Sequence, residues 1–339
     1  MLKEKLKVND PGITRTSLLA LHAFDEAILD SDLSDDQLCS SDTALIGATT
    51  VGGMCLTDEL YQDANRKDTT GSVFLSSYDC GSVALYLQRR YKIQGIVNTI
   101  NTACSSSANA IMYGARLIRH GLARRAIVGG ADSLAKFTIN GFNALHILSP
   151  EICAPFDKDR KGLNLGEGAA FLVLEKEEDV HNRKVYAELT GYGNANDAFH
   201  ASSISEQGDG PYLAMQRALL SAQLHVDDIS CINAHGTGTE NNDETECRAM
   251  LRLFTKPPVF VSTKSYTGHT LGASGAIEAV YTVLQLSHQE IYPSLHFKEA
   301  IPSVSLEPAR SYKTMQVNHA MSNSFGFGGN CTSLIFSKT

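Results

Sequence analysis

The chain has 339 residues, of which 43% are hydrophobic and 19% are charged, and its formal net charge is −8. These proportions are those of a folded globular protein and exclude a disordered one. The negative charge argues against nucleic acid as a partner, and no apolar run approaches the roughly 20 residues that cross a membrane. The first residues lack the apolar core of a secretion signal, and the eight cysteines show no CxxC spacing, so we expect a reducing, cytoplasmic location.

Helices and strands alternate along the first half of the chain, which predicts an α/β fold. Apolar residues recur at helical spacing over residues 17–29. Apolar and β-branched runs then predict strands, which fall at residues 44–48, 93–100, 126–130 and 169–174. A charged run follows, where we place the boundary between an N-terminal half, residues 1–180, and a C-terminal half, residues 181–339. A solvated loop inside one domain is the other interpretation of that run.

Cys104 lies where the second of these strands meets a helix. Small residues surround it, and a helical pattern then continues to Gly121. Free backbone N–H groups and the helix dipole lower the pKa of a thiol at such a turn, so we expect a nucleophile with a lowered pKa. A buried structural cysteine is the alternative that this local pattern leaves open. The other seven cysteines have no metal-binding spacing and are interpreted as core or surface thiols.

The second half repeats this order of strand, turn and helix. A helix over residues 211–224 precedes a strand at 229–233, which ends in a turn carrying His235. An amphipathic helix follows to about residue 254. Cys104 and His235 therefore hold comparable positions in the two halves.

Two further stretches carry residues of chemical interest. A strand at 259–262 leads into a small-residue turn with Lys264 and His269, and then into a helix with Glu278. Near the C-terminus, the glycines of residues 322–330 permit close backbone approach, as an oxyanion site or a moving loop requires. Neither stretch ends in the Gly-Lys-Ser/Thr of a phosphate-binding loop.

Together these residues resemble the β-ketoacyl synthases of the thiolase superfamily, in particular the elongating, synthase II-like acyl-carrier-protein synthases with a Cys-His-His triad. The resemblance extends from about residue 15 to the C-terminus and rests on five ordered stretches: residues 101–105, 155–160 with 166–169, 233–239, 264–275 and 323–329. It implies a thiolase-like fold, whose duplicated halves form α-β-α-β-α layers. Family members carry a longer segment before the nucleophile, so we expect the first N-terminal strand region to be missing, which would expose a sheet edge in place of a central strand. The chain also departs from the family pattern at Asn330 and Cys331, where threonine and asparagine are usual.

The resemblance implies a role for each site residue. Cys104 would take an acyl group, while the backbone N–H groups of Cys104 and Phe327 would hold the thioester oxygen. His235 and His269 would donate hydrogen bonds to the enolate formed when a malonyl thioester loses carbon dioxide, and Lys264 would tune the charge state around His269. The other implied positions are the substrate contacts Thr237, Thr239 and Phe142, the mobile gate Phe327, and the supporting residues Glu278, Asn233, Ser322 and Asn323, which in some relatives surround a structural monovalent cation.

The implied reaction is a decarboxylative Claisen condensation that elongates a fatty acyl, polyene or polyketide chain. Its substrates travel on the phosphopantetheine of an acyl carrier protein, so we expect no further cofactor and no catalytic metal. Arg66 and Lys67 are candidate contacts to this acidic carrier, although solvated surface charge is the other interpretation of the pair. A homodimer is expected, with a heterodimer as the alternative.

Two other functions compete with an elongating synthase. A non-elongating partner subunit of the chain-length-factor kind usually lacks the nucleophile, so the complete set of Cys104, His235 and His269 argues against it. A Cys-His hydrolase explains neither the second histidine turn nor Lys264.

Overall fold

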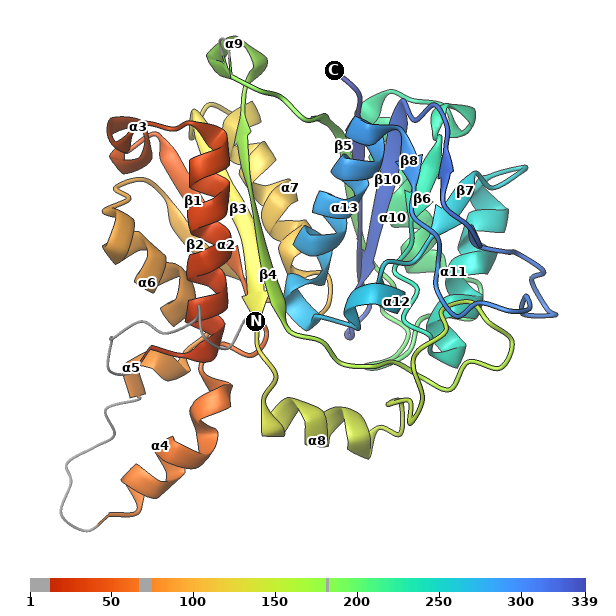
Figure 1. Ribbon diagram of the computed structural model, residues 1–339, viewed down its shortest axis with the longest axis horizontal. Helices are drawn as coiled ribbons and strands as arrows, with labels where there is room; N and C mark the ends of the chain where they lie inside the picture. The colour runs from red at the N-terminus through yellow and green to blue at the C-terminus, as the bar shows by residue number, and fades with distance from the viewer. Residues whose placement is uncertain (1–12, 67–74, 181–182) are drawn as a thin grey trace.

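The computed structural model describes residues 13–66, 75–180 and 183–339. Two sheets stand side by side with helices on their outer faces, and helices α7 (Ser106–Arg119) and α13 (Ser274–His288) lie between them (Figure 1). The layers therefore follow the order α-β-α-β-α, which confirms the predicted arrangement. In this part of the chain, no helix combines the length and the apolar character needed to cross a membrane.

The first sheet has four strands in the order β2-β1-β3-β4. They are β1 (Thr43–Ala48), β2 (Val97–Ile100), β3 (Arg125–Asp132) and β4 (Gly168–Glu175). β1 pairs in parallel with β2 and β3, whereas β4 runs antiparallel to β3. β1 and β3 are buried along their whole lengths, because helices cover both faces of the sheet, and their nearly continuous apolar runs are typical of such strands.

The second sheet has five strands in the order β5-β11-β10-β6-β7. They are β5 (Glu188–Asn196), β6 (Cys231–Asn233), β7 (Val259–Val261), β10 (His319–Phe325) and β11 (Asn330–Ser337). β7, β6 and β10 are parallel, and β11 is antiparallel to both β10 and β5. A separate pair joins β8 (Glu290–Ile291) to β9 (Lys313–Thr314).

The two sheets repeat one another in order and direction. The series β7-β6-β10-β11 corresponds to β2-β1-β3-β4, and only β5 lacks a counterpart. β5 is an edge strand beside β11, and in the described part of the chain no strand takes the equivalent place beside β4. The expectation of an absent central strand is therefore wrong, because the unmatched position lies at an edge of the sheet.

Helices of the outer layers cover the sheets from both sides of the molecule. α2 (Arg15–Ser31) and α6 (Gly81–Tyr91) pack on the first sheet, while α10 (Asp209–Ala222) and α11 (Glu240–Leu253) cover the second. The remaining short helices are α3 (Asp35–Cys39), η1 (Met54–Leu56), α4 (Thr57–Ala64), α5 (Leu75–Tyr78), α8 (Lys136–Ala144), α9 (Glu177–Val180), η2 (Val226–Asp228), α12 (Lys264–Thr267) and η3 (Leu271–Ala273).

Contacts in the central layer join the two halves near the strand ends. The Ser107 hydroxyl of α7 accepts the Ala276 N–H of α13 at 2.8 Å. Asp132, at the end of β3, accepts the Gly272 N–H at 2.7 Å and the Val51 N–H at 2.9 Å. These bonds fix the turn after His269 relative to the end of the first sheet, where the nucleophile turn also lies.

Candidate active site

Cys104 occupies a strained turn between β2 and α7. Ala103 has a φ of 52°, an uncommon conformation for a residue with a side chain. Cys104, the residue that follows, is 6% exposed. Gly326 packs against this turn so closely that a Cβ there would lie 2.5 Å from the Thr102 carbonyl oxygen. Only glycine at 326 allows this approach of the C-terminal loop to the nucleophile.

Burial determines the acidity of Cys104. It raises the pKa of the thiol to about 11, although the positive charge of Lys264 and a hydrogen bond from the Phe327 backbone act in the opposite direction. The expectation of a lowered pKa is therefore wrong. The helix N-terminus favours a thiolate, but removal of the sulfur from water costs more than that local effect supplies.

We expect alkylation of Cys104 by iodoacetamide to accelerate by roughly tenfold per pH unit from pH 7 to pH 9, since only the thiolate reacts and its pKa lies higher. Mass spectrometry of the peptide that contains Cys104 measures the rate separately from those of the other cysteines. A rate that levels off before pH 9 would contradict the raised pKa.

Both histidines carry their proton on the nitrogen away from their anchoring contact. His235 follows β6, and its Nδ1 lies 3.2 Å from the Lys264 ammonium, which can only donate. The Nδ1 of His269 receives the Leu271 N–H at 3.3 Å and lies 2.9 Å from the Ser274 hydroxyl. Since each Nδ1 is an acceptor, each Nε2 carries the N–H, and the two rings meet edge to face with centroids 5.5 Å apart.

The two imidazoles are held in the neutral form. Burial lowers the pKa of His235 well below its usual value, and the positive charge of Lys264 and the neighbouring His269 add to this effect. Burial and Lys264 also lower the pKa of His269. Each ring is therefore a hydrogen-bond donor without a positive charge.

Lys264 forms a buried ion pair with Glu278 on α13. Burial raises the pKa of Glu278 to about 7 despite the adjacent positive charge of Lys264. The sequence analysis expects Lys264 to tune the charge state around His269. In the structure, the Lys264 ammonium contacts the ring of His235 instead. Its charge nevertheless lowers the pKa of both rings, so one lysine acts on the pair.

The turn that carries His235 is held by a buried acid of α11, which the sequence interpretation missed. The Glu246 carboxylate accepts the backbone N–H groups of His235 and Gly236, both at 2.9 Å. Asp243, one helical turn earlier, accepts the Gly238 N–H at 3.1 Å. The sequence contained a sign of this role. Asp243 and Glu246 fall at helical spacing on the same buried face of α11 as Met250.

Replacement of Glu246 with glutamine should remove part of the pH dependence of folding stability. Burial raises the pKa of Glu246 to about 7 from a usual 4.5, so the folded chain binds more protons than the unfolded chain between these values. Its contribution to stability therefore falls as the pH rises from about 4.5 to about 7. Glu246→Gln should also cost about 1–3 kcal/mol, because the amide N–H would face one of the two backbone donors. Urea unfolding at pH 5.5 and pH 8 tests both effects, and an unchanged pH dependence would contradict the assignment.

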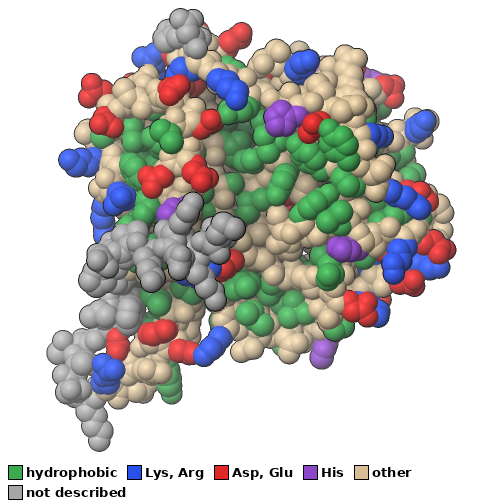
Figure 2. Space-filling view, viewed as in Figure 1, with side chains coloured by type: hydrophobic (Ala, Val, Ile, Leu, Met, Phe, Trp, Pro, Cys, Tyr) green, Lys and Arg blue, Asp and Glu red, His purple; other side chains and the backbone are tan. Residues whose placement is uncertain are grey.

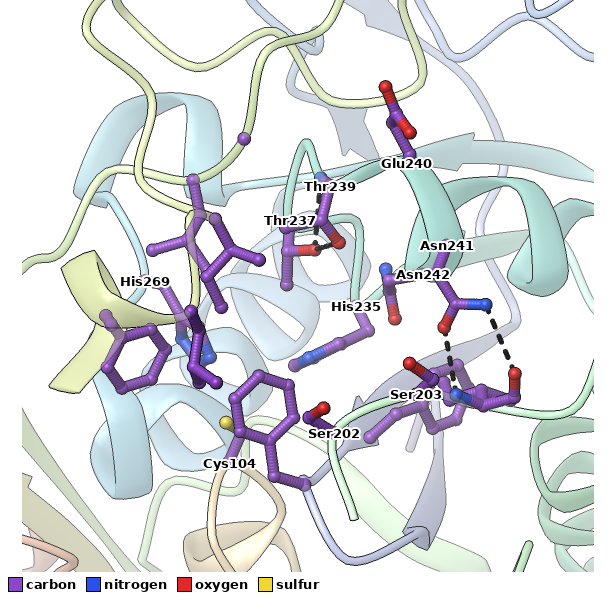
Figure 3. A pocket seen from close by; sticks show the side chains of 18 of the residues that line it. Cys104, Ser202, Ser203, His235, Thr237, Thr239, Glu240, Asn241, Asn242 and His269 are labelled. Carbon is purple, nitrogen blue, oxygen red and sulfur yellow. Dashed lines mark hydrogen bonds between the residues drawn. The ribbon is translucent and has the colours of Figure 1, made fainter. Parts of the chain in front are cut away.

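A cavity of about 510 Å³ brings these groups together. Cys104, His235 and His269 point into the same space, with Thr237 and Thr239 beside them (Figure 3). The two threonine hydroxyls lie 2.9 Å apart. Phe142 of α8 and Phe327 stack with centroids 5.8 Å apart and also line the cavity, together with Leu145, Leu163, Ser202, Ser203, Ile204 and Asn241.

The four supporting residues do not form one cluster. Asn233 and Ser322 are register partners on β6 and β10, and the Asn233 amide donates to the Glu278 carbonyl oxygen at 3.2 Å. Asn323 follows Ser322 in the strand, faces the other side and contacts Glu246. Ser322 Oγ and Glu278 Oε2 are buried without a hydrogen-bond partner among the described residues. Such oxygens suit a hard cation, so Asn233, Ser322 and Glu278 fit the implied cation site, and the Asn323 side chain does not.

Of the two candidate carrier contacts, the structure describes Arg66, which does not line the cavity. Arg66 follows α4 at the surface, where its guanidinium lies 3.4 Å from the Asp63 carboxylate, and Lys67 is outside the described residues. On the face drawn in Figure 2, Lys and Arg side chains are scattered among Asp and Glu. A carrier contact through Arg66 and Lys67 stays a prediction.

Known proteins match the chain along nearly its whole length. The N-terminal domain of β-ketoacyl synthases matches residues 10–180, and the C-terminal domain matches residues 186–298. A 3-oxoacyl-[acyl-carrier-protein] synthase 2 of Rhizobium meliloti is 37% identical over 99% of this chain and 82% of the relative. The mitochondrial 3-oxoacyl-[acyl-carrier-protein] synthase of Arabidopsis thaliana is 34% identical over 99% of this chain and 77% of the relative.

Solved structures agree with these matches. The ishigamide ketosynthase/chain length factor has a TM-score of 0.92 at 29% identity, covering 98% of this chain and 84% of that one. A ketosynthase of Xenorhabdus doucetiae, in complex with its chain length factor, has a TM-score of 0.85 at 34% identity, covering 97% and 82%. Two matching domains, relatives above 30% identity and a shared fold lead to one conclusion: the chain belongs to the β-ketoacyl synthase family.

Proposed function

We propose that the protein is a β-ketoacyl-acyl-carrier-protein synthase that condenses an acyl group on Cys104 with a malonyl group on the carrier. One observation carries the proposal: a buried thiol and two neutral imidazoles, each with its N–H on Nε2, face a single cavity. A hydrolase needs one imidazole that takes up a proton, whereas both rings here are kept from protonation.

The first step is acyl transfer to Cys104. Its sulfur attacks the thioester carbonyl, the bond to the phosphopantetheine sulfur breaks, and the thiol proton ends on that departing sulfur. The backbone N–H groups of Cys104 and Phe327 stabilise the negative charge that develops on the carbonyl oxygen. Such preorganised donors are typically worth about 3–4 kcal/mol each.

The second step forms the carbon–carbon bond. The malonyl carboxylate leaves as carbon dioxide, and the electron pair of the broken bond forms an enolate, whose oxygen accepts both Nε2–H groups of His235 and His269. The enolate carbon attacks the acyl thioester, the bond to the Cys104 sulfur breaks, and the thiolate takes a proton from solvent. Thr237 and Thr239 contact the phosphopantetheine arm, and Phe327 with Phe142 separates the acyl and malonyl sides.

Mass measurement of the intact protein tests this function. The protein is mixed with a series of acyl-carrier-protein thioesters and then with malonyl-carrier protein, and Cys104→Ala is the control. Addition of one acyl group that requires Cys104, followed by its loss as 3-ketoacyl-carrier protein appears, is the expected result. Acylation followed by release of free acid would indicate a hydrolase, and no acylation by any donor would overturn the catalytic proposal.

The assembly is also proposed. Two similar structures are described as ketosynthases with a chain length factor, which supports a heterodimer beside the homodimer expected from the sequence. All eight cysteines are free thiols in the described residues, which supports action in the reducing cytoplasm. Asn233, Ser322 and Glu278 would hold a monovalent cation, which would give the second carboxylate oxygen of Glu278 the partner that it lacks among the described residues.

A further inference from the structure

A half-buried side-chain amide joins the C-terminal loop to the nucleophile turn. Asn330 begins β11, directly after the loop that carries Phe327. Its side-chain Oδ1 lies 2.8 Å from the Ser105 hydroxyl and 2.8 Å from the Asn109 amide nitrogen, both at the start of α7. Asn194 of β5 donates to the same oxygen at 3.0 Å. One carbonyl oxygen therefore receives three donors from two distant segments.

The orientation of this amide is fixed by its neighbours. The Asn109 and Asn194 amide nitrogens can only donate, so they require an oxygen and not a nitrogen of Asn330 to face them. The Oδ1 of Asn109 is itself occupied by the Thr332 hydroxyl at 2.8 Å and by Asn194 at 3.0 Å. The Ser105 hydroxyl precedes the first turn of α7 and makes no capping bond. It lies 2.8 Å from both the Thr102 carbonyl oxygen and the Asn330 Oδ1, so its one proton is shared between the nucleophile turn and Asn330.

The same residue closes the loop through its backbone. The Asn330 carbonyl accepts the Gly326 N–H at 2.7 Å, and the Gly329 N–H returns to the Gly326 carbonyl at 3.0 Å. Gly326 lies against the Thr102–Cys104 turn, and the Phe327 backbone reaches the Cys104 sulfur by a hydrogen bond. Asn330 thus contacts the segments on both sides of the oxyanion site. Its backbone holds the loop that carries the Phe327 N–H, and its side chain holds the start of α7, next to the Cys104 N–H.

We infer that Asn330 is a positioning residue that sets the separation of the Cys104 and Phe327 N–H groups around the acyl oxygen. This inference rests on the proposed synthase function. Asn330 is not among the residues that line the cavity, and its amide acts by fastening the loop to Ser105 and Asn109. Loss of the amide lets the loop shift away from α7, so the Phe327 N–H no longer meets the developing oxyanion.

Two reactions of the same thiol test the inference. Acyl transfer from the carrier passes through an oxyanion, whereas alkylation by iodoacetamide displaces iodide at a saturated carbon and needs no oxyanion donor. In Asn330→Ala, acylation of Cys104 by the best acyl-carrier-protein donor should slow by about 10- to 100-fold. This effect is smaller than the rate loss of about 10²–10³-fold that removal of a whole oxyanion donor causes, because the Phe327 N–H is displaced and not removed. Alkylation of Cys104 should change by less than about threefold, because the thiol itself stays in place.

A milder variant and a matched control complete the experiment. Ser105→Ala removes one of the donors and should slow acylation by less, and its combination with Asn330→Ala should add no further loss, since both act through one network. Asn318→Ala, at an exposed asparagine beside the same sheet, should leave both reactions unchanged. Equal slowing of acylation and alkylation, or unchanged acylation in Asn330→Ala, would overturn the inference. Failure of the unaltered protein to be acylated would instead overturn the synthase function itself.

Discussion

Replacement of Lys264 with methionine is expected to lower the free energy of unfolding by about 3–5 kcal/mol at pH 8, because it leaves a buried carboxylate without its ion-pair partner. The exposed fractions of the two side chains are 1% for Lys264 and 3% for Glu278, so water does not replace the lost contact. Urea unfolding of the variant and the unaltered protein measures the difference. Condensation should fall as well, because the Lys264 charge adds to burial in lowering the pKa of His235 and His269, and Lys264 also contacts the Nδ1 of His235.

The loss of stability in Lys264→Met should depend on pH. Burial already raises the pKa of Glu278 to about 7 with Lys264 present, and removal of the adjacent charge raises it further. At pH 5 the carboxyl group of the folded chain is protonated with or without Lys264, so the cost of its buried charge is absent there and grows as the pH rises past 7. The double variant Lys264→Met/Glu278→Leu should regain most of the stability, since no buried charge remains. Equal losses at pH 5 and pH 8, or no recovery in the double variant, would contradict this account.

The helices and strands of both halves could be predicted because they follow hydrophobic periodicity. The patterns at residues 17–29, 126–130 and 169–174 correspond to α2, β3 and β4, each found slightly longer. Helix α8 has no buried residue, so no apolar stripe marks it in the sequence. The predicted central position of the unmatched strand was wrong. Strand order along a sheet follows from pairing between distant segments, and local sequence patterns do not contain that information.

The residues of the site could be named from motifs, but their contacts could not. Cys104, His235 and His269 lie in turns whose small residues are visible in the sequence, and the structure brings them to one cavity. Two contacts depend on packing between different strand ends and could not be predicted: Lys264 contacts the ring of His235, and Glu246 holds the turn that carries His235. The predicted direction of the Cys104 pKa shift was wrong for the same reason. A helix N-terminus is a local feature that the sequence shows, whereas burial is a property of the whole fold.

Replacement of His235 or His269 with leucine is expected to lower the rate of condensation by roughly 10²–10³-fold in each case, because each removes one N–H donor from the enolate oxygen. Acylation of Cys104 should change far less, since in the proposed mechanism its oxyanion is held by backbone groups. Stopped reactions analysed by intact mass report acylation, and the appearance of 3-ketoacyl-carrier protein reports condensation. Glutamine at either position, with an N–H near the place of the imidazole Nε2, should retain more condensation than leucine does.

The pH profile separates donation by neutral rings from acid–base catalysis by a charged one. Because burial lowers both histidine pKa values below the usual 6.5, the folded chain binds fewer protons than the unfolded chain as the pH falls through 6.5. The two rings therefore contribute stability that is complete above about pH 6.5 and declines below it. Condensation that stays constant from pH 8 to pH 6.5 fits two neutral donors. If His269→Leu lost acylation as completely as condensation, that histidine would instead act on the Cys104 thiol as its base, and the division of labour between backbone donors and imidazoles would be wrong.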